Sequence, residues 1–133
     1  MFNNKKGFTL VELLAVIVIL AIILAVAIPS ISGIITNAKK GGFESDAKMI
    51  ITGIEYRLLE HSIDTAKPEP IVHTTELVAD RLTELANYGA VSANYTDFSI
   101  TSMNPITITL TSDSTSQFGV QTGSGTKTTF TAD

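Results

Sequence analysis

The sequence predicts an α+β fold in which a long N-terminal helix packs against a small antiparallel β-sheet head. Three observations predict it. Residues 13–28 form an uncharged apolar run, apolar residues then keep helical spacing to about residue 61, and the pattern changes to period two after residue 97. The chain has 133 residues and no cysteine, so packing must hold the fold without disulfides or thiolate metal sites.

The apolar run is long enough to cross a membrane. Between Phe8 and residue 28 only Thr9 and Glu12 interrupt it, and a helix of that length spans roughly 30 Å, the thickness of a bilayer's hydrocarbon core. Lys5 and Lys6 come directly before it. The positive-inside rule therefore places the N-terminus in the cytoplasm and everything after Pro29 outside it.

Two ordinary interpretations of this run compete. One is a secretory signal peptide with residues 25–27, Ala-Val-Ala, as its cleavage site, although the run is longer than a typical h-region of about 7 to 15 residues. The other is an uncleaved membrane anchor. Glu12 fits neither well, because a carboxylate inside a lipid-facing helix costs about 2.5 to 3.5 kcal/mol on insertion scales unless it has a partner.

Residues 5–14, KKGFTLVELL, resemble the class III signal of type IV prepilins and pseudopilins. The resemblance covers roughly residues 5–30 and implies cleavage by prepilin peptidase between Gly7 and Phe8, followed by N-methylation of Phe8. It implies that Glu12 pairs with the N-terminal amine of a neighbouring subunit during assembly. Pairing with the amine of its own chain, or protonation of Glu12, stays open as an alternative.

The resemblance also implies a function and partners. The protein is expected to be a structural subunit of a type IV pilus or pilus-like filament, serving adhesion, motility, secretion or DNA uptake. Expected partners are copies of itself or sister pilins, the prepilin peptidase, an assembly ATPase and its membrane platform protein. The precursor is expected in the cytoplasmic membrane and the assembled form at the bacterial cell surface. A secreted or membrane-anchored binding module is the alternative function.

This interpretation divides the chain into four parts. They are a leader peptide at residues 1–7, a hydrophobic transmembrane and polymerisation helix at 8–29, an amphipathic helical stem at 30–63, and a globular head at 64–133. Pro29 is expected to kink the helix, because proline removes a hydrogen bond and crowds the preceding turn. A continuous helix to residue 61 would be about 80 Å long. One face of the stem is expected to pack and the other to be charged.

The head is predicted to begin with a loop at residues 64–75 and a short helix at 75–88 that ends at Gly89. The apolar side of this helix is expected to cover the sheet or the stem. Strands are predicted at 98–103, 106–111, 117–122 and 127–131. In the second strand isoleucine alternates with threonine, which should turn apolar side chains inward and hydroxyls toward water.

No catalytic, cofactor or metal site is predicted. His61 and His73 have no third ligand nearby in the sequence, the aspartates are too scattered for a calcium loop, and no nucleophile arrangement or phosphate loop is recognisable. The net charge of −4 does not favour nucleic-acid binding by the domain as a whole, so DNA is a possible partner without support.

Overall fold

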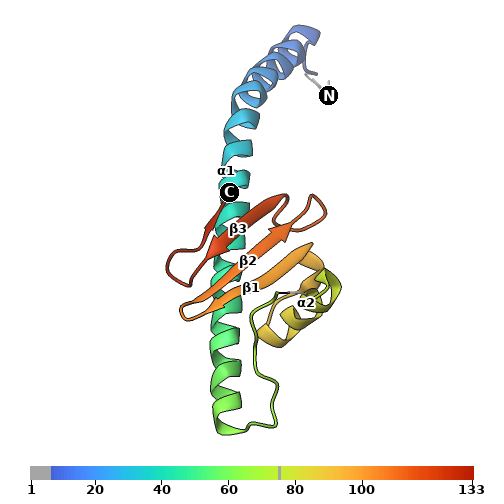
Figure 1. Cartoon of the computed structure of the whole chain (residues 1–133). Coiled ribbons are helices and arrows are strands. Elements are labelled where there is room, and N and C mark those ends of the chain that lie inside the picture. The colour runs from blue at the N-terminus through green and yellow to red at the C-terminus, as the bar shows by residue number, and fades with distance from the viewer. Residues whose placement is uncertain (1–6, 75) are drawn as a thin grey trace. The chain divides into compact units, whose positions relative to one another are not determined.

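The computed structural model describes residues 7–74 and 76–133. These residues belong to two compact units, one ending at Asn37 and the other formed by Ala38–Asp133. The described chain begins with two α-helices, continues with two short 3-10 helices and ends with four strands (Figure 1). The elements are α1 (Leu10–Ile63), α2 (Val78–Glu84), η1 (Leu85–Tyr88), η2 (Ser92–Asn94), β1 (Asp97–Met103), β2 (Ile106–Ser112), β3 (Gln121–Gly125) and β4 (Thr131–Ala132).

Helix α1 has 54 residues and is helical through Pro29 and the Gly41–Gly42 pair. It ends at Ile63, close to the predicted end near residue 61. The α+β prediction is confirmed, because this long helix is followed by a small four-stranded antiparallel sheet. The predicted leader falls largely on residues 1–6, which lie outside the described residues, as do Lys5 and Lys6.

The strands follow one another in the sheet in the order β1-β2-β3-β4, and each pairs with its neighbour in antiparallel register. Ile100 lies opposite Ile108 and Leu110 lies opposite both Phe98 and Gly123. The register of β1 shifts between Ile100 and Ser102, which leaves Thr101 as the extra residue of a bulge. Such a simple up-and-down order needs only short connections.

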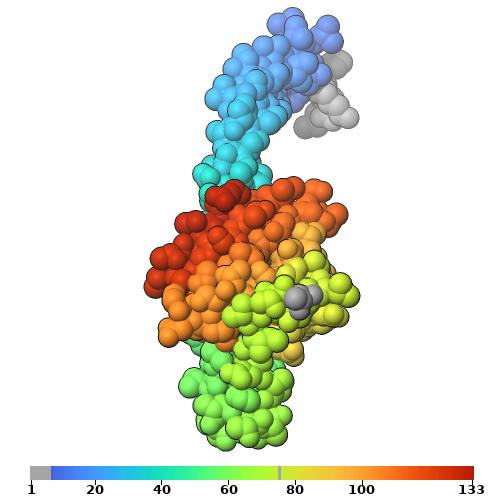
Figure 2. Space-filling model, in the orientation of Figure 1, coloured from blue at the N-terminus to red at the C-terminus, as the bar shows by residue number. Residues whose placement is uncertain are grey.

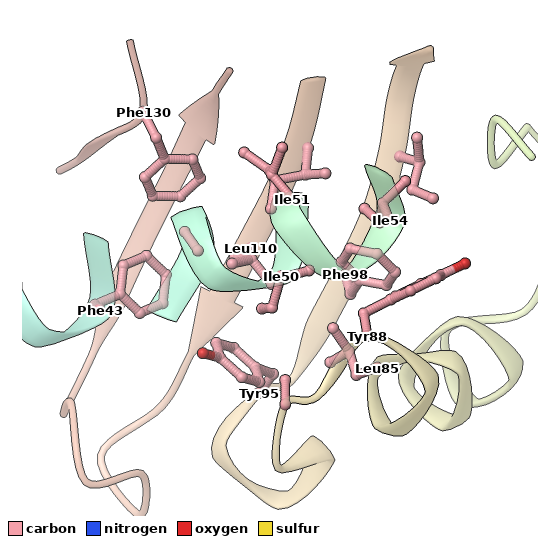
Figure 3. Close-up of a cluster of buried hydrophobic side chains, with 14 of the residues drawn as sticks. Phe43, Ile50, Ile51, Ile54, Leu85, Tyr88, Tyr95, Phe98, Leu110 and Phe130 are labelled. Carbon is pink, nitrogen blue, oxygen red and sulfur yellow. The ribbon is translucent and has the colours of Figure 1, made fainter. Parts of the chain in front are cut away.

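The core of the second unit lies between the sheet and the part of α1 that follows Asn37 (Figure 3). Phe43 stands among three other aromatic rings, with centroids 6.0 Å from Tyr95, 5.8 Å from Phe118 and 6.0 Å from Phe130. The helix adds four further buried residues, Ala47, Ile50, Ile51 and Ile54. The stem of the helix is therefore part of the head's own core.

The opposite face of the sheet is polar. Ile108 and Leu110 of β2 are buried, whereas the threonines that alternate with them, Thr107, Thr109 and Thr111, are partly exposed. In Figure 2 the strands, coloured orange to red, make up much of the visible face of the second unit. The predicted alternation of inward isoleucine and outward threonine is confirmed in this strand.

The side of the stem away from the core carries apolar residues in addition to the predicted charged ones. Within the second unit, the side of α1 away from the core exposes apolar residues, with charged side chains along the borders of this face. Core-facing residues of α1 recur at Phe43, Ala47, Ile50 and Ile54, and a second apolar set uses the same three- and four-residue spacing on the other side. The three- and four-residue spacing of apolar residues in α1 thus describes two faces of the helix, one packed in the core and one exposed.

The short helix of the head is also different from the prediction. Helix α2 covers only Val78–Glu84 and is followed by η1, and the predicted start at Thr75 lies outside the described residues. Leu85 is buried and Leu82 is partly buried against the core, but Leu77 and Val78 are exposed. The end at Gly89 is confirmed, because this glycine has a φ of 85° in the left-handed region.

The last two strands are shorter and later than predicted. Residues 113–119 form turns, with the Ser116 N–H donating to the Asp113 carbonyl and Gly119 at a φ of 70°. Residues 126–130 form another turn, which is closed by the Phe130 N–H bonding the Thr126 carbonyl. A β-carbon on Gly123 would lie 2.8 Å from the Phe130 ring, so glycine in β3 makes room for this core aromatic.

Candidate assembly segment at the N-terminus

The helix begins with a reciprocal pair of hydrogen bonds between Thr9 and Glu12. The Thr9 N–H donates to Oε2 of Glu12 over 2.9 Å, and the Glu12 N–H donates to Oγ1 of Thr9 over 3.2 Å. The Leu13 N–H bonds the Thr9 carbonyl, which is the first helical hydrogen bond. This is a capping box, in which an N-cap threonine and an acid three residues later satisfy each other's backbone donors.

The capping box gives Glu12 a function within its own chain. A carboxylate in the first turn also interacts favourably with the helix dipole. This role of Thr9 was not predicted, although the sequence carries its signal, a threonine followed three residues later by a glutamate at the start of an apolar run. Glu12 therefore already has a hydrogen-bonding partner before any subunit contact.

Gly7 and Phe8 precede the helix, and both are exposed. The side chain of Phe8 is 90% exposed, and a β-carbon on Gly7 would meet no atom within 4 Å. The Gly7–Phe8 peptide bond thus lies outside regular secondary structure, just before the start of the helix. That geometry suits a segment that another protein must grip and cut, because it has no secondary structure to unfold first.

The helix from Leu10 to Asn37 exposes nearly all of its apolar side chains. It contains the one helical stretch among the described residues that is long and apolar enough to cross a membrane, and none of that stretch is buried. A signal sequence near the N-terminus would have a similar length and composition. What the structure adds is that this surface has no covering partner within the described chain.

Near Pro29 two serines return hydrogen bonds to the helix backbone. The Ser30 hydroxyl donates to the Ala27 carbonyl over 2.8 Å, and the Ser32 hydroxyl donates to the Ile28 carbonyl over 3.2 Å. Pro29 has no N–H, so the Ala25 carbonyl lacks its usual helical donor. Hydroxyls that bond the preceding turn are a common companion of bends in apolar helices. A kink at Pro29 stays a prediction.

Known proteins are similar to this chain at its N-terminal end and over a longer stretch. Residues 2–28 match the family described as "Prokaryotic N-terminal methylation motif". The competence protein ComGC of Halalkalibacterium halodurans is 34% identical over 80 residues, which cover 56% of this chain and 78% of that protein. This chain belongs to the type IV pilin and pseudopilin family. No solved structure matches it.

Membership of the pilin and pseudopilin family gives the exposed helix a biological setting. Proteins of this family are structural, and their N-terminal methylation motif goes with a membrane-anchored precursor and a pilus-like filament at the surface. The family also implies assembly with copies of the chain or with sister pilins.

The two histidines of this pilin-like chain have structural roles. Nε2 of His61 lies 3.7 Å from a Glu69 carboxylate oxygen, and His73 is buried with its Nε2 3.1 Å from Glu84. Nδ1 of His73 accepts a hydrogen bond from the Ile100 N–H over 2.9 Å and so occupies the free edge of β1. The part of the chain that the structure describes holds no group of three or more potential metal-ligating side chains.

Each histidine thus lies beside one carboxylate, which the sequence analysis did not expect. The partners are eight and eleven residues away along the chain, and only the folded loop and α2 bring them together. Edge strands with unpaired N–H groups invite pairing with other chains. The imidazole of His73 blocks part of that edge by accepting a hydrogen bond from the Ile100 N–H.

Proposed function

We propose that this chain is a pseudopilin of a competence-type filament that takes part in DNA uptake. The proposal is supported by the similarity to ComGC over most of that protein's length, together with the methylation motif at the N-terminus. In this role the head would be a structural module, and the filament would act with the rest of an uptake system. DNA need not contact this subunit, which carries a net charge of −4.

The observation that carries the filament role is the uncovered apolar surface of α1 from Leu10 onward. While the precursor is in the membrane, lipid would cover this surface. After extraction into water it can stay stable only when other apolar surfaces cover it, because a patch of this size is otherwise an aggregation site. The apolar helices of sister subunits supply such a surface. Each subunit would therefore leave the membrane as it joins the filament.

We propose that maturation cuts the chain between Gly7 and Phe8 and methylates the new amine of Phe8. The new cation would stand one residue before the capping threonine. The Glu12 carboxylate then has two possible partners, the Thr9 N–H within its chain and the Phe8 amine of an adjacent subunit. In a bundle of low dielectric a charge pair of this kind can offset the cost of burying both groups.

The further partners we propose are the prepilin peptidase, an assembly ATPase and a membrane platform protein. The peptidase requires access to the Gly7–Phe8 bond, and both residues are exposed. The precursor would cross the membrane once with its N-terminus inside, as Lys5 and Lys6 indicate. The head, residues 64–133, would then fold outside the cytoplasm.

The deciding experiment is the mass and N-terminal sequence of the mature protein isolated from its cells. A start at methylated Phe8 supports the proposal. A start at Ile28 would indicate ordinary signal-peptide cleavage, and an intact Met1 would indicate a plain anchor. Replacing Gly7 with valine provides the control, because the precursor should then accumulate in the membrane without conversion.

The competence role needs its own test. Deleting the gene should abolish uptake of labelled DNA, and returning the wild-type gene should restore it. Normal uptake in the deletion strain, with loss of surface filaments, would show that the filament serves another purpose. That outcome would leave the maturation proposal standing.

A further inference from the structure

The segment that leads from the end of α1 back to the sheet is fastened at both ends by a histidine. This segment, called the return loop, covers residues 64–73, and Figure 1 shows it in green, running from the end of α1 toward β1 and α2. Residues 64–69 are all exposed. At the first end Nδ1 of His61 donates to the Lys67 carbonyl over 2.7 Å, and at the second end His73 binds β1.

The second end of the return loop binds both backbone groups of one residue in the sheet. The Ile100 N–H donates to Nδ1 of His73 over 2.9 Å, and the His73 N–H donates to the Ile100 carbonyl over 2.9 Å. Ile100 belongs to β1, which is an edge strand. The two bonds therefore hold the return loop on an edge whose backbone groups would otherwise need water or another strand.

The hydrogen bonds of the His73 ring determine which nitrogen carries the proton. Nδ1 accepts a hydrogen bond, so it has no proton in this arrangement. Nε2 lies 3.1 Å from a Glu84 carboxylate oxygen, which is an acceptor, so Nε2 carries the proton of the neutral ring. The side chain of His73 is 0% exposed, and its ring packs edge-on against Phe98. The neutral imidazole thus fits every partner it has.

A protonated ring does not fit this place. A proton on Nδ1 would point at the Ile100 N–H, a second donor only 2.9 Å from Nδ1, so this hydrogen bond cannot persist. A released His73 can take up the proton in water, whereas the fastened ring cannot take it up at Nδ1. Binding of protons therefore favours the released state, and histidine changes charge between about pH 5 and 8.

The acidic neighbour of His73 does not compensate for the lost bond. Glu84 attracts a protonated ring, but it does so at Nε2, and its side chain is 34% exposed, so it can follow the ring outward. Other titratable groups on the elements beside His73 already have partners: the Tyr88 hydroxyl bonds Glu84, Asp97 is paired with Arg81, and Glu76 accepts from the Thr74 N–H.

We propose that His73 is a pH-sensitive latch, which fastens the return loop to β1 when its imidazole is neutral and releases the loop when the imidazole is protonated. The latch acts within the head and does not depend on filament assembly. Release frees the N–H and the carbonyl of Ile100 and opens this part of the sheet edge.

The first end of the return loop responds differently to acid. Both nitrogens of His61 face acceptors, because Nδ1 bonds the Lys67 carbonyl and Nε2 lies 3.7 Å from a Glu69 carboxylate oxygen. A protonated His61 can therefore keep both partners. The loop opens at its His73 end while its His61 end stays in place.

Opening of the return loop is a local event. A cavity of about 100 Å³ lies between the loop and the helices, lined by Pro68, Glu69 and Pro70 of the loop and by Arg57, Glu84, Asn87 and Tyr88. Packing beneath the loop is thus incomplete, and the loop's exposed residues add little apolar contact. Segments with few buried contacts open at a lower free energy than the whole domain.

Amide hydrogen exchange of the full-length protein in detergent micelles tests the latch. The protection factor of the Ile100 amide, corrected for the intrinsic exchange rate at each pH, should be about ten-fold or more lower at pH 5 than at pH 7.5. The Leu110 amide in the neighbouring strand β2 should keep its protection, because the sheet itself stays folded. Equal protection of Ile100 at the two pH values would overturn the proposal.

A matched pair of substitutions assigns the effect to one histidine. His73→Asn places an amide oxygen close to the position of Nδ1 and cannot be protonated in this range, so the protection of Ile100 should become independent of pH. His61→Asn is the control, in which the loss of protection at pH 5 should persist. A loss of protection that remains in His73→Asn would show that another group is responsible.

A measurement on the wild type alone covers a His73→Asn protein that fails to fold. Nitrogen-15 NMR of the histidine rings reports which ring nitrogen carries a proton. We expect Nδ1 of His73 to be unprotonated at pH 7.5 and its protonation to coincide with the loss of protection at Ile100. A proton on Nδ1 at pH 7.5, or a protonated ring beside a protected Ile100 amide, would contradict the latch.

Discussion

The hydroxyl of Tyr95 donates a hydrogen bond to the carboxylate of Asp46, 49 residues earlier in the chain. Tyr95 follows η2 and its ring packs against Phe43, so one side chain joins the segment before β1 to helix α1 by both an aromatic and a polar contact. The tyrosine is buried and the aspartate is partly exposed. This bond fastens the head to its stem.

Tyr95→Phe should therefore destabilise the head while leaving its packing intact. Loss of a hydrogen bond to a charged group costs about 1.5 to 3 kcal/mol, and we expect the lower end because water can reach Asp46. The measurement is the urea unfolding of a soluble piece containing residues 30–133, monitored by circular dichroism. An unchanged midpoint would show that the bond contributes nothing to stability.

Alkaline pH should weaken the head through the same residue. Burial and the nearby acids Asp46 and Glu84 raise the pKa values of Tyr95 and Tyr88 well above the usual value near 10. Above about pH 10 the unfolded chain loses these protons and the folded chain keeps them, so the free energy of unfolding falls as pH rises. The Tm of the wild type should decline from pH 8 to 11, and the Tm of Tyr95→Phe should decline less steeply over the same range.

Gly53→Ala should destabilise the head, although alanine in place of glycine usually stabilises a helix. A β-carbon there would lie 2.4 Å from the backbone carbonyl oxygen of Tyr88, so the helix and η1 would have to move apart. Overpacking of this kind costs about 1 to 3 kcal/mol. Gly41→Ala is the matched control on the same helix, because no atom lies within 4 Å of its β-carbon position.

The control should move in the opposite direction. Alanine at an open helical site stabilises by about 0.5 to 1 kcal/mol relative to glycine. Urea midpoints of the two variants, measured on the same soluble piece, should lie on either side of the wild-type midpoint. Stabilisation by both substitutions would mean that helix α1 and η1 are farther apart in solution.

Glu12→Ala separates the two partners proposed for this carboxylate. If Glu12 pairs with the Phe8 amine of an adjacent subunit, cleavage and membrane insertion should persist while sheared filament yield falls. Thr9→Ala is the control, because it removes the capping hydroxyl but keeps the carboxylate. Loss of the cap alone costs about 1 kcal/mol of helix stability.

A filament defect in Glu12→Ala with normal filaments in Thr9→Ala would support the pair between subunits. Equal defects would assign the effect to helix capping. Normal filament yield from Glu12→Ala would contradict the pairing role directly, and Glu12→Asp, with its shorter reach, should then behave like wild type as well.

Local patterns in the sequence were sufficient for the elements that depend only on neighbours in the chain. The uncharged run that ends before Pro29 defined the apolar helix, and the motif around Gly7 and Glu12 indicated the family. Alternating isoleucine and threonine located β2, because side chains of a strand alternate between its faces. The end of the short helix at Gly89 followed from the same kind of local rule.

Tertiary structure decided what those patterns left ambiguous. A three- and four-residue repeat cannot tell which of two apolar faces is covered, and only the sheet shows that Ile50 and Ile54 are core while Tyr56 and Leu59 are not. The partners of His73 and Tyr95 depend on contacts between distant segments, as does the tight fit at Gly53. Burial is a property of packed neighbours, and periodicity reports only the directions in which side chains point.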